Sequence, residues 1–172
     1  RRGGGSRGSC HSGTPLTALA YADSMTVEEL DVTRTDESVG VLTSLPTPTL
    51  WFYLPVGLNE TTAELVIKDS LDRLVYQGEL TGEMTEAGVI EVPLAMSLPS
   101  GRALRWFLTM DCDESDRTTV DGWIESRNPG PDLARTFTQA TPRNRVALYT
   151  NYGYLHDALS ELAGLRQLNP DD

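Results

Sequence analysis

The chain has no long apolar segment and little positive charge, and each absence restricts what it can do. No stretch approaches the roughly 18 apolar residues of a membrane-spanning helix. The net charge is -11 at pH 7, which argues against nucleic acid and anionic membrane as partners because both need a basic surface. No signal peptide is present, as expected of an exported chain whose signal has been removed.

Histidine and recognisable catalytic motifs are equally scarce. His11 and His156 are the two histidines, and Asp157 and Ser160 beside the second complete the residue types of a catalytic triad. However, the chain has no nucleophile elbow, and this histidine and serine are one turn apart on one expected helix. No cysteine or histidine pair has zinc-ligand spacing, and glycines 3–5 do not form a phosphate loop. We therefore expect a non-enzymatic protein without a cofactor.

The N-terminal arm, residues 1–14, is basic and glycine-rich, whereas the rest of the chain is acidic. Such a composition is typical of a flexible segment. An arm of this kind can add as a strand to the exposed sheet edge of a neighbouring copy, or it can simply be held by its own disulfide. The residues that we expect to mediate assembly are Arg1, Arg2, Gly3, Gly4, Gly5 and Arg7.

Cys10, in the arm, and Cys112 are the only two cysteines. They are either unrelated thiols or a disulfide that closes a loop of roughly 100 residues, worth about 4–5 kcal/mol in the chain-entropy account. We favour the disulfide because little else would hold Cys10 in place. A disulfide indicates an oxidising compartment, which is extracellular or periplasmic for an exported chain.

Residues 15–128 have the two-residue periodicity of β-strands. The clearest stretch is 102–127, which reads as two strands joined by an acidic loop, with Leu104, Trp106, Leu108 and Met110 on one face. Further strands are expected at 16–21, 50–54, 62–68, 73–80 and 88–94, with one short strand within 22–38. In the strand expected at 73–80, Leu74, Tyr76 and Leu80 are expected to align on one face. These strands favour a mainly β, immunoglobulin-like antiparallel β-sandwich.

Residues 129–172 change to helical periodicity and predict a short C-terminal α-helical extension. One helix is expected at 132–140, and Thr141 followed by Pro142 is a strong start for a second. A third is expected at 155–168. The segment looks like a single tetratricopeptide hairpin, which either caps the sandwich or docks a partner. The positions that carry this likeness are Ala147, Tyr149, Gly153, Ala158, Leu159 and Pro170.

Nearly the whole chain resembles a family of secreted, mainly cyanobacterial proteins described as domain of unknown function 928. The matching pieces, in order, are residues 16–19, 50–55, 105–107 with 112–113, 116–117, 122–125, 140–143, 147–149, 157–159 and 169–172. The resemblance implies export and a β-rich fold, and it also suggests that Cys10 pairs with Cys112. It implies no particular activity.

Two further groups of residues are candidate ligand sites. Asp111, Asp113 and Asp116, with neighbouring acids, surround the hairpin loop and provide oxygens of the kind that calcium binds, although their spacing matches no EF-hand. The alternative is a solvated acidic loop. Trp51, Tyr53, Trp106 and Trp123 either line a sugar-binding face or belong to the core.

The sequence therefore favours a secreted structural protein that self-associates through its arm into an extracellular filament or cell-surface assembly. The alternative is an envelope-associated module that binds a glycan or a protein partner. An enzyme is the weakest of the three possibilities.

Overall fold

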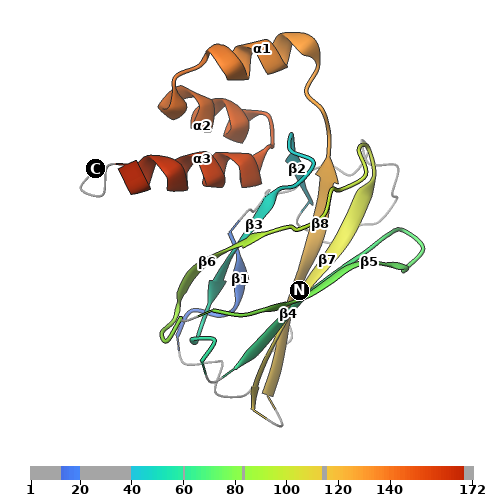
Figure 1. The fold of residues 1–172 in the computed structure, drawn as a ribbon, viewed down its shortest axis with the longest axis vertical. Coiled ribbons are helices and arrows are strands. Elements are labelled where there is room, and N and C mark those ends of the chain that lie inside the picture. The colour runs from blue at the N-terminus through green and yellow to red at the C-terminus, as the bar shows by residue number, and fades with distance from the viewer. Residues whose placement is uncertain (1–12, 20–39, 60, 83, 114–115, 169–172) are drawn as a thin grey trace. The chain divides into compact units, whose positions relative to one another are not determined.

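The computed structural model describes residues 13–19, 40–59, 61–82, 84–113 and 116–168 (Figure 1). This part of the chain forms eight strands followed by three helices. The strands are β1 (Thr17–Ala18), β2 (Gly40–Thr43), β3 (Thr49–Leu54), β4 (Thr62–Lys68), β5 (Leu74–Leu80), β6 (Gly88–Pro93), β7 (Ala103–Asp113) and β8 (Asp116–Ser126). The helices are α1 (Pro131–Gln139), α2 (Pro142–Asn151) and α3 (Leu155–Leu168).

The strands form two sheets, one of three strands in the order β1-β3-β6 and one of five in the order β2-β8-β7-β4-β5. The described chain is therefore mixed α/β rather than mainly β. The pairs β1–β3, β4–β5 and β4–β7 are antiparallel, but β2 and β8 run parallel, with Val41 opposite Ile124. The prediction of an antiparallel sandwich is wrong at this pair, because partners so distant in sequence leave no local turn signal to read.

The chain divides into two compact units. Within the described residues, the first unit takes its members from 13–19, 51–92 and 104–122. The second takes its members from 40–50, 93–103 and 123–168. The predicted domain boundaries after residues 14 and 128 stay a prediction.

The core of the first unit follows the alternation that the sequence predicts. Ala63, Leu65 and Ile67 on β4 are buried, and β7 buries Trp106 and alternate residues on both sides of it. Trp106 meets Phe52 of β3 edge to face, with ring centroids 5.4 Å apart, so the inner faces of the two sheets pack together here. Such an aromatic pair adds about 0.5–1.5 kcal/mol beyond the burial of apolar area.

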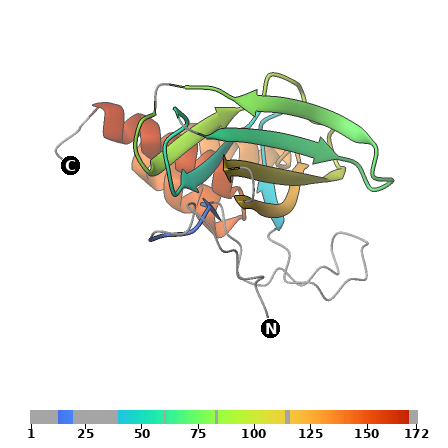
Figure 2. The same cartoon turned by 90° about the horizontal axis from the view of Figure 1, so that it is seen from below.

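β4 and β5 pair as a long hairpin (Figure 2). β5 is the outermost strand of its sheet, and none of its residues is fully buried. Leu74 is 59% exposed, so it does not share the buried environment expected from its alignment with Tyr76 and Leu80. It lies beside the register shift between Ile67 and Lys68, which interrupts the regular pairing at this end of the strand.

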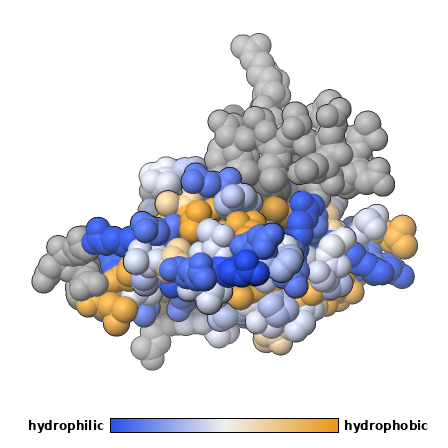
Figure 3. All heavy atoms as spheres, turned by 90° about the horizontal axis from the view of Figure 1, so that it is seen from above, coloured by the Kyte–Doolittle hydropathy of each residue, from blue (hydrophilic) through white to orange (hydrophobic). Residues whose placement is uncertain are grey.

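The second unit contains the three helices, together with β2 and the end of β8 that pairs with it. The three helices lie where the sequence predicts them, and Thr141 caps α2 by accepting a hydrogen bond from the backbone N–H of Asn144. Leu42, Phe137 and Tyr154 form a buried cluster, with Leu133, Leu148 and Tyr149 packed against it. Among the described residues of this unit, Tyr152 and Leu162 are each about half exposed. The face of the molecule drawn in Figure 3 carries hydrophobic and hydrophilic residues side by side.

Candidate functional site

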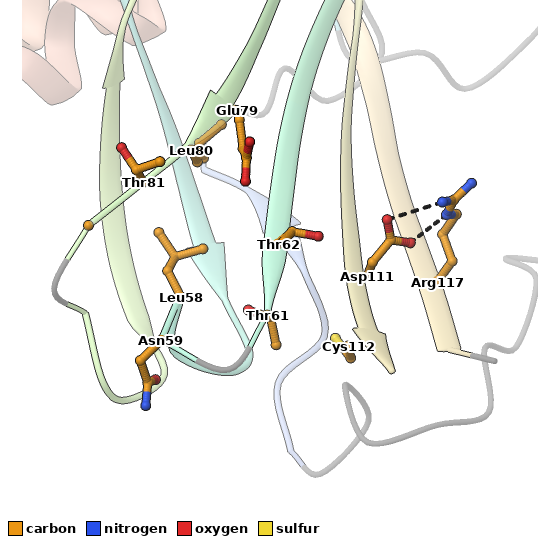
Figure 4. A pocket seen from close by; sticks show the side chains of 11 residues that line it. Leu58, Asn59, Thr61, Thr62, Glu79, Leu80, Thr81, Asp111, Cys112 and Arg117 are labelled. Atoms are coloured by element: carbon orange, nitrogen blue, oxygen red, sulfur yellow. Dashed lines mark hydrogen bonds and ion pairs between the residues drawn. The ribbon is translucent and has the colours of Figure 1, made fainter. Parts of the chain in front are cut away.

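A groove of about 730 Å³ lies in the first unit where four strands begin or end (Figure 4). We call it the strand-end groove. Its wall comprises the start of β4, the end of β5, the end of β7 and the start of β8, together with the loop before β4. The residues that line it are Leu58, Asn59, Thr61, Thr62, Glu79, Leu80, Thr81, Gly82, Asp111, Cys112 and Arg117. Its size lies within the range of about 300–1,000 Å³ that is usual for small-molecule sites.

The loop before β4 keeps its shape through close backbone packing. Leu58 donates its backbone N–H to the carbonyl of Met84 at 2.8 Å, and the Thr61 hydroxyl donates to the carbonyl of Gly57 at 2.7 Å. A Cβ on Gly57 would lie only 2.5 Å from the backbone of Thr85. Glycine is therefore required at this position, because any side chain would force the loop away from residues 84–85.

Charge in the groove is concentrated on Asp111, Arg117 and Glu79. Arg117 donates two hydrogen bonds to Asp111, one of them from Nη2 to Oδ2 at 3.1 Å (Figure 4). This hydrogen bonding holds the pKa of Asp111 below its usual value and raises the pKa of Arg117. Both side chains are exposed, so the pair does more to orient charge than to stabilise the fold.

Glu79 belongs to a strip of carboxylates on the outer face of the sheet. It lies directly opposite Glu64 in the register of β4 and β5. The Gln77 side-chain amide donates to Glu64, and Arg117 acts on Glu64 only at longer range. Like charges placed opposite each other destabilise a sheet, so this strip favours a cationic partner.

Among the described residues, the calcium candidates do not form a metal site. Asp111 is paired with Arg117, and the neighbouring Asp121 is paired with Arg105 at 2.7 Å. The side chains of Asp113 and Asp116 lie outside the described residues. Within the described part of the chain, no three or more histidine, cysteine, aspartate or glutamate residues are grouped as metal ligands would be.

The four aromatic candidates do not form one face. Trp106 is 1% exposed and belongs to the core, which is the second of the two alternatives that the sequence left open. Trp51 and Tyr53 are partly exposed on β3, whereas Trp123 is on β8 in the other sheet. Alternation along a strand turns Trp106 inward, because its neighbours at every second position are the apolar core residues of β7.

The expected assembly residues, Arg1 to Gly5 and Arg7, lie outside the described residues, as does Cys10. Cys112 lines the strand-end groove. The disulfide between Cys10 and Cys112 therefore stays a prediction. Of its two residues, the structure describes Cys112, which lies at this groove.

A second polar group, which we call the Asp157 cluster, consists of Thr43, Ser44 and Asp157 in the second unit. The Thr43 hydroxyl donates to Asp157 Oδ1 at 2.7 Å, and the backbone N–H and hydroxyl of Ser44 both donate to Oδ2. Burial raises the pKa of Asp157, while the hydrogen bonds from Ser44 and Thr43 act in the opposite direction. Burial also raises the pKa of Tyr149, and the charge of Asp157 adds to this rise.

The Asp157 cluster ties the end of β2 to the first turn of α3 and does not resemble a catalytic triad. The Ser160 hydroxyl donates to the backbone carbonyl of His156 at 2.9 Å. The imidazole of His156 is buried, and within the described residues neither of its nitrogens has a hydrogen-bond partner. Burial lowers the pKa of His156 to about 3, so the ring is neutral at pH 7.

Sequence reasoning missed Thr43 and Ser44 because they follow a stretch that reads as a polar loop. A polar pair directly after Val41 and Leu42 is a weak signal that a short strand ends there. No local pattern indicates that its partner is Asp157, which is 114 residues from Thr43.

Comparison with known proteins gives a family for the chain. Residues 2–172 match the family described as Domain of Unknown Function (DUF928). The chain belongs to the DUF928 family. This membership covers nearly all of the sequence and agrees with the resemblance seen in its motifs. No curated protein matches this DUF928 chain.

One solved structure with partial likeness is a β-glucuronidase from Parabacteroides merdae, which is 13% identical and superimposes with a TM-score of 0.29. The match covers 45% of the DUF928 chain and 11% of the glucuronidase. Among the described residues, no helix has the length and apolar character needed to cross a membrane.

Proposed function

We propose that this DUF928 chain is a secreted, non-enzymatic subunit that self-associates into an extracellular filament or cell-surface assembly. Each subunit is an immunoglobulin-like sandwich, and the N-terminal arm of one copy binds the body of the next. A disulfide between Cys10 and Cys112 anchors the arm at the strand-end groove of its own chain. Because arm and acceptor are different surfaces, the contact is head-to-tail and need not close into a ring.

The observation that carries this proposal is the outer edge of β5, with which no other strand of the described residues pairs. The backbone groups on that side of the strand can accept another extended segment, which is the mode of β-strand addition. The arm complements the edge in charge, because it contains Arg1, Arg2 and Arg7 and no acid, whereas Glu64 and Glu79 lie beside the edge.

Deletion of residues 1–9 is expected to convert an assembling protein into a monomer, because it removes all three arginines and the glycines while leaving Cys10. Sedimentation velocity and light scattering, from micromolar to millimolar protein, measure this change. A suitable control replaces residues 1–9 by nine residues of glycine and serine, which retain the length but not the charge. A parent protein that is strictly monomeric over the whole range contradicts the proposal.

A second candidate function is an envelope-associated binding module for a glycan or a protein partner. The strand-end groove favours it, because its polar lining includes Asn59, Thr61 and Thr62 and its volume suits a small ligand or a short segment of chain. Screening the arm-deleted monomer on a glycan array separates the two candidates. Specific hits that are lost on Asn59→Ala would support the module, and no binding would remove its support.

A further inference from the structure

The described sheets have four edge strands, and they differ in how well they could accept a further strand. β1 has only two residues, and β6 ends in Pro93, which cannot donate to a ladder. β2 is covered in the second unit, where α3 contacts it and the N–H of Leu42 donates to the carbonyl of Gly153 at 3.1 Å.

β5 is the remaining edge, and its protection is limited to the register shift at its start and the single charged side chain of Glu79. It has seven residues, none of which is proline or lysine, and among the described residues no strand pairs with its outer side. Natural edge strands are commonly blocked by such residues, by a covering element or by being very short. An edge of this length with no pairing strand among the described residues is able to accept another strand.

The arm matches this edge in length as well as in charge. Residues 1–7 would span about 23 Å when extended, as would a strand of the length of β5. Arg1 and Arg7 are an even number of positions apart, so both side chains would lie on one face of the added strand. Gly3, Gly4 and Gly5 between them carry no side chains that could collide with the exposed Leu74.

We infer that the acceptor for the arm is the β5 edge of a second copy, where one arginine side chain of the arm lies over the strip formed by Glu64 and Glu79. This inference rests on the proposed self-association and specifies its acceptor. The backbone ladder provides most of the binding, and the carboxylate strip determines the orientation of the arm and its affinity for this edge rather than another. At the end of β5, Glu79 also lines the strand-end groove, so the bound arm lies beside the groove of the copy that accepts it.

The test is a double variant, Glu64→Lys with Glu79→Lys, measured by sedimentation velocity against a matched control. Glu91→Lys is the control because Glu91 is an exposed glutamate on β6, the edge of the other sheet. The double variant is expected to raise the concentration for half-association by about tenfold or more, since like charges then face each other across the contact. Glu91→Lys is expected to change it by less than about twofold.

A compensating variant makes the test independent of any effect on folding. An arm carrying Arg1→Glu, Arg2→Glu and Arg7→Glu is expected to fail to associate alone but to associate with the double variant when the two are mixed. A third variant, Gly3→Pro, Gly4→Pro and Gly5→Pro, retains the charges but removes three backbone donors. It is expected to abolish association if the arm adds as a strand.

The outcomes distinguish this inference from the proposed function. If deletion of residues 1–9 abolishes association but the double variant associates like the parent, the acceptor is not β5 and only the inference fails. If Glu91→Lys disrupts association instead, the acceptor is the β6 edge and the inference is again wrong. If the parent never associates, both are contradicted.

Discussion

Replacement of Asp157 by alanine is expected to lower the free energy of unfolding by about 3–5 kcal/mol. The substitution removes the carboxylate that accepts hydrogen bonds from Thr43 and from both donors of Ser44. Asp157 is 4% exposed and Thr43 is 0% exposed, so water replaces these bonds poorly. Because the bonds join β2 to the first turn of α3, helical signal is expected to be lost earliest. Urea denaturation followed by circular dichroism measures both effects.

The matched control for this substitution is Asp132→Ala on α1. Its carboxylate side chain is 94% exposed and pairs with Arg135 at 3.3 Å, so alanine there is expected to change stability by less than about 0.5 kcal/mol. A loss of less than about 1 kcal/mol in Asp157→Ala would contradict the role given to the Asp157 cluster, because buried donors without an acceptor cost more than that.

Acid is expected to destabilise the protein through His156. The folded state binds a proton on this ring only near pH 3, whereas the unfolded chain binds it near pH 6.5. The loss of stability caused by His156 is therefore close to zero well above pH 6.5. It grows as the pH falls from 6.5 to about 3 and is constant below pH 3. It amounts to about 2 kcal/mol of lost stability at pH 5 and about 3 kcal/mol at pH 4. Asp157 has the opposite effect on stability in acid. Burial raises its folded-state pKa above the ordinary value of 3.8, so protonation of this carboxyl adds stability as the pH falls from the raised value toward 3.8.

His156→Leu isolates this contribution, because leucine fills the buried site and binds no proton. Between pH 7 and pH 5, the free energy of unfolding of this variant is expected to decrease much less than that of the parent. His11→Leu is the matched control, since His11 is the only other histidine, and it is expected to respond to acid like the parent. Equal acid sensitivity of His156→Leu and the parent would mean that the ring is solvated or partnered in solution.

The parts of the fold that the sequence predicted well are those determined by local periodicity. Alternation placed Leu65 and Ile67 in the core, and a threonine followed by Pro142 marked the start of α2. These signals involve neighbouring residues, so they can be detected in a single sequence. The predicted hairpin of β7 and β8 belongs to the same class, because its strands are adjacent along the chain.

The parts that the sequence did not predict depend on contacts between distant segments. β2 has four residues and lies parallel to β8, and its polar end meets Asp157 from more than 100 positions away. The exposure of Leu74 depends on β5 being an edge strand, which alternation alone does not reveal.

Hydrogen exchange of the β5 amides at increasing protein concentration tests the central claim most directly. If the arm of one copy pairs with this strand in the next, amides on the outer side of residues 74–80 become protected as concentration rises. That protection disappears when residues 1–9 are deleted. Exchange at β5 that is fast and independent of concentration, in a parent protein that nevertheless associates, would contradict the account.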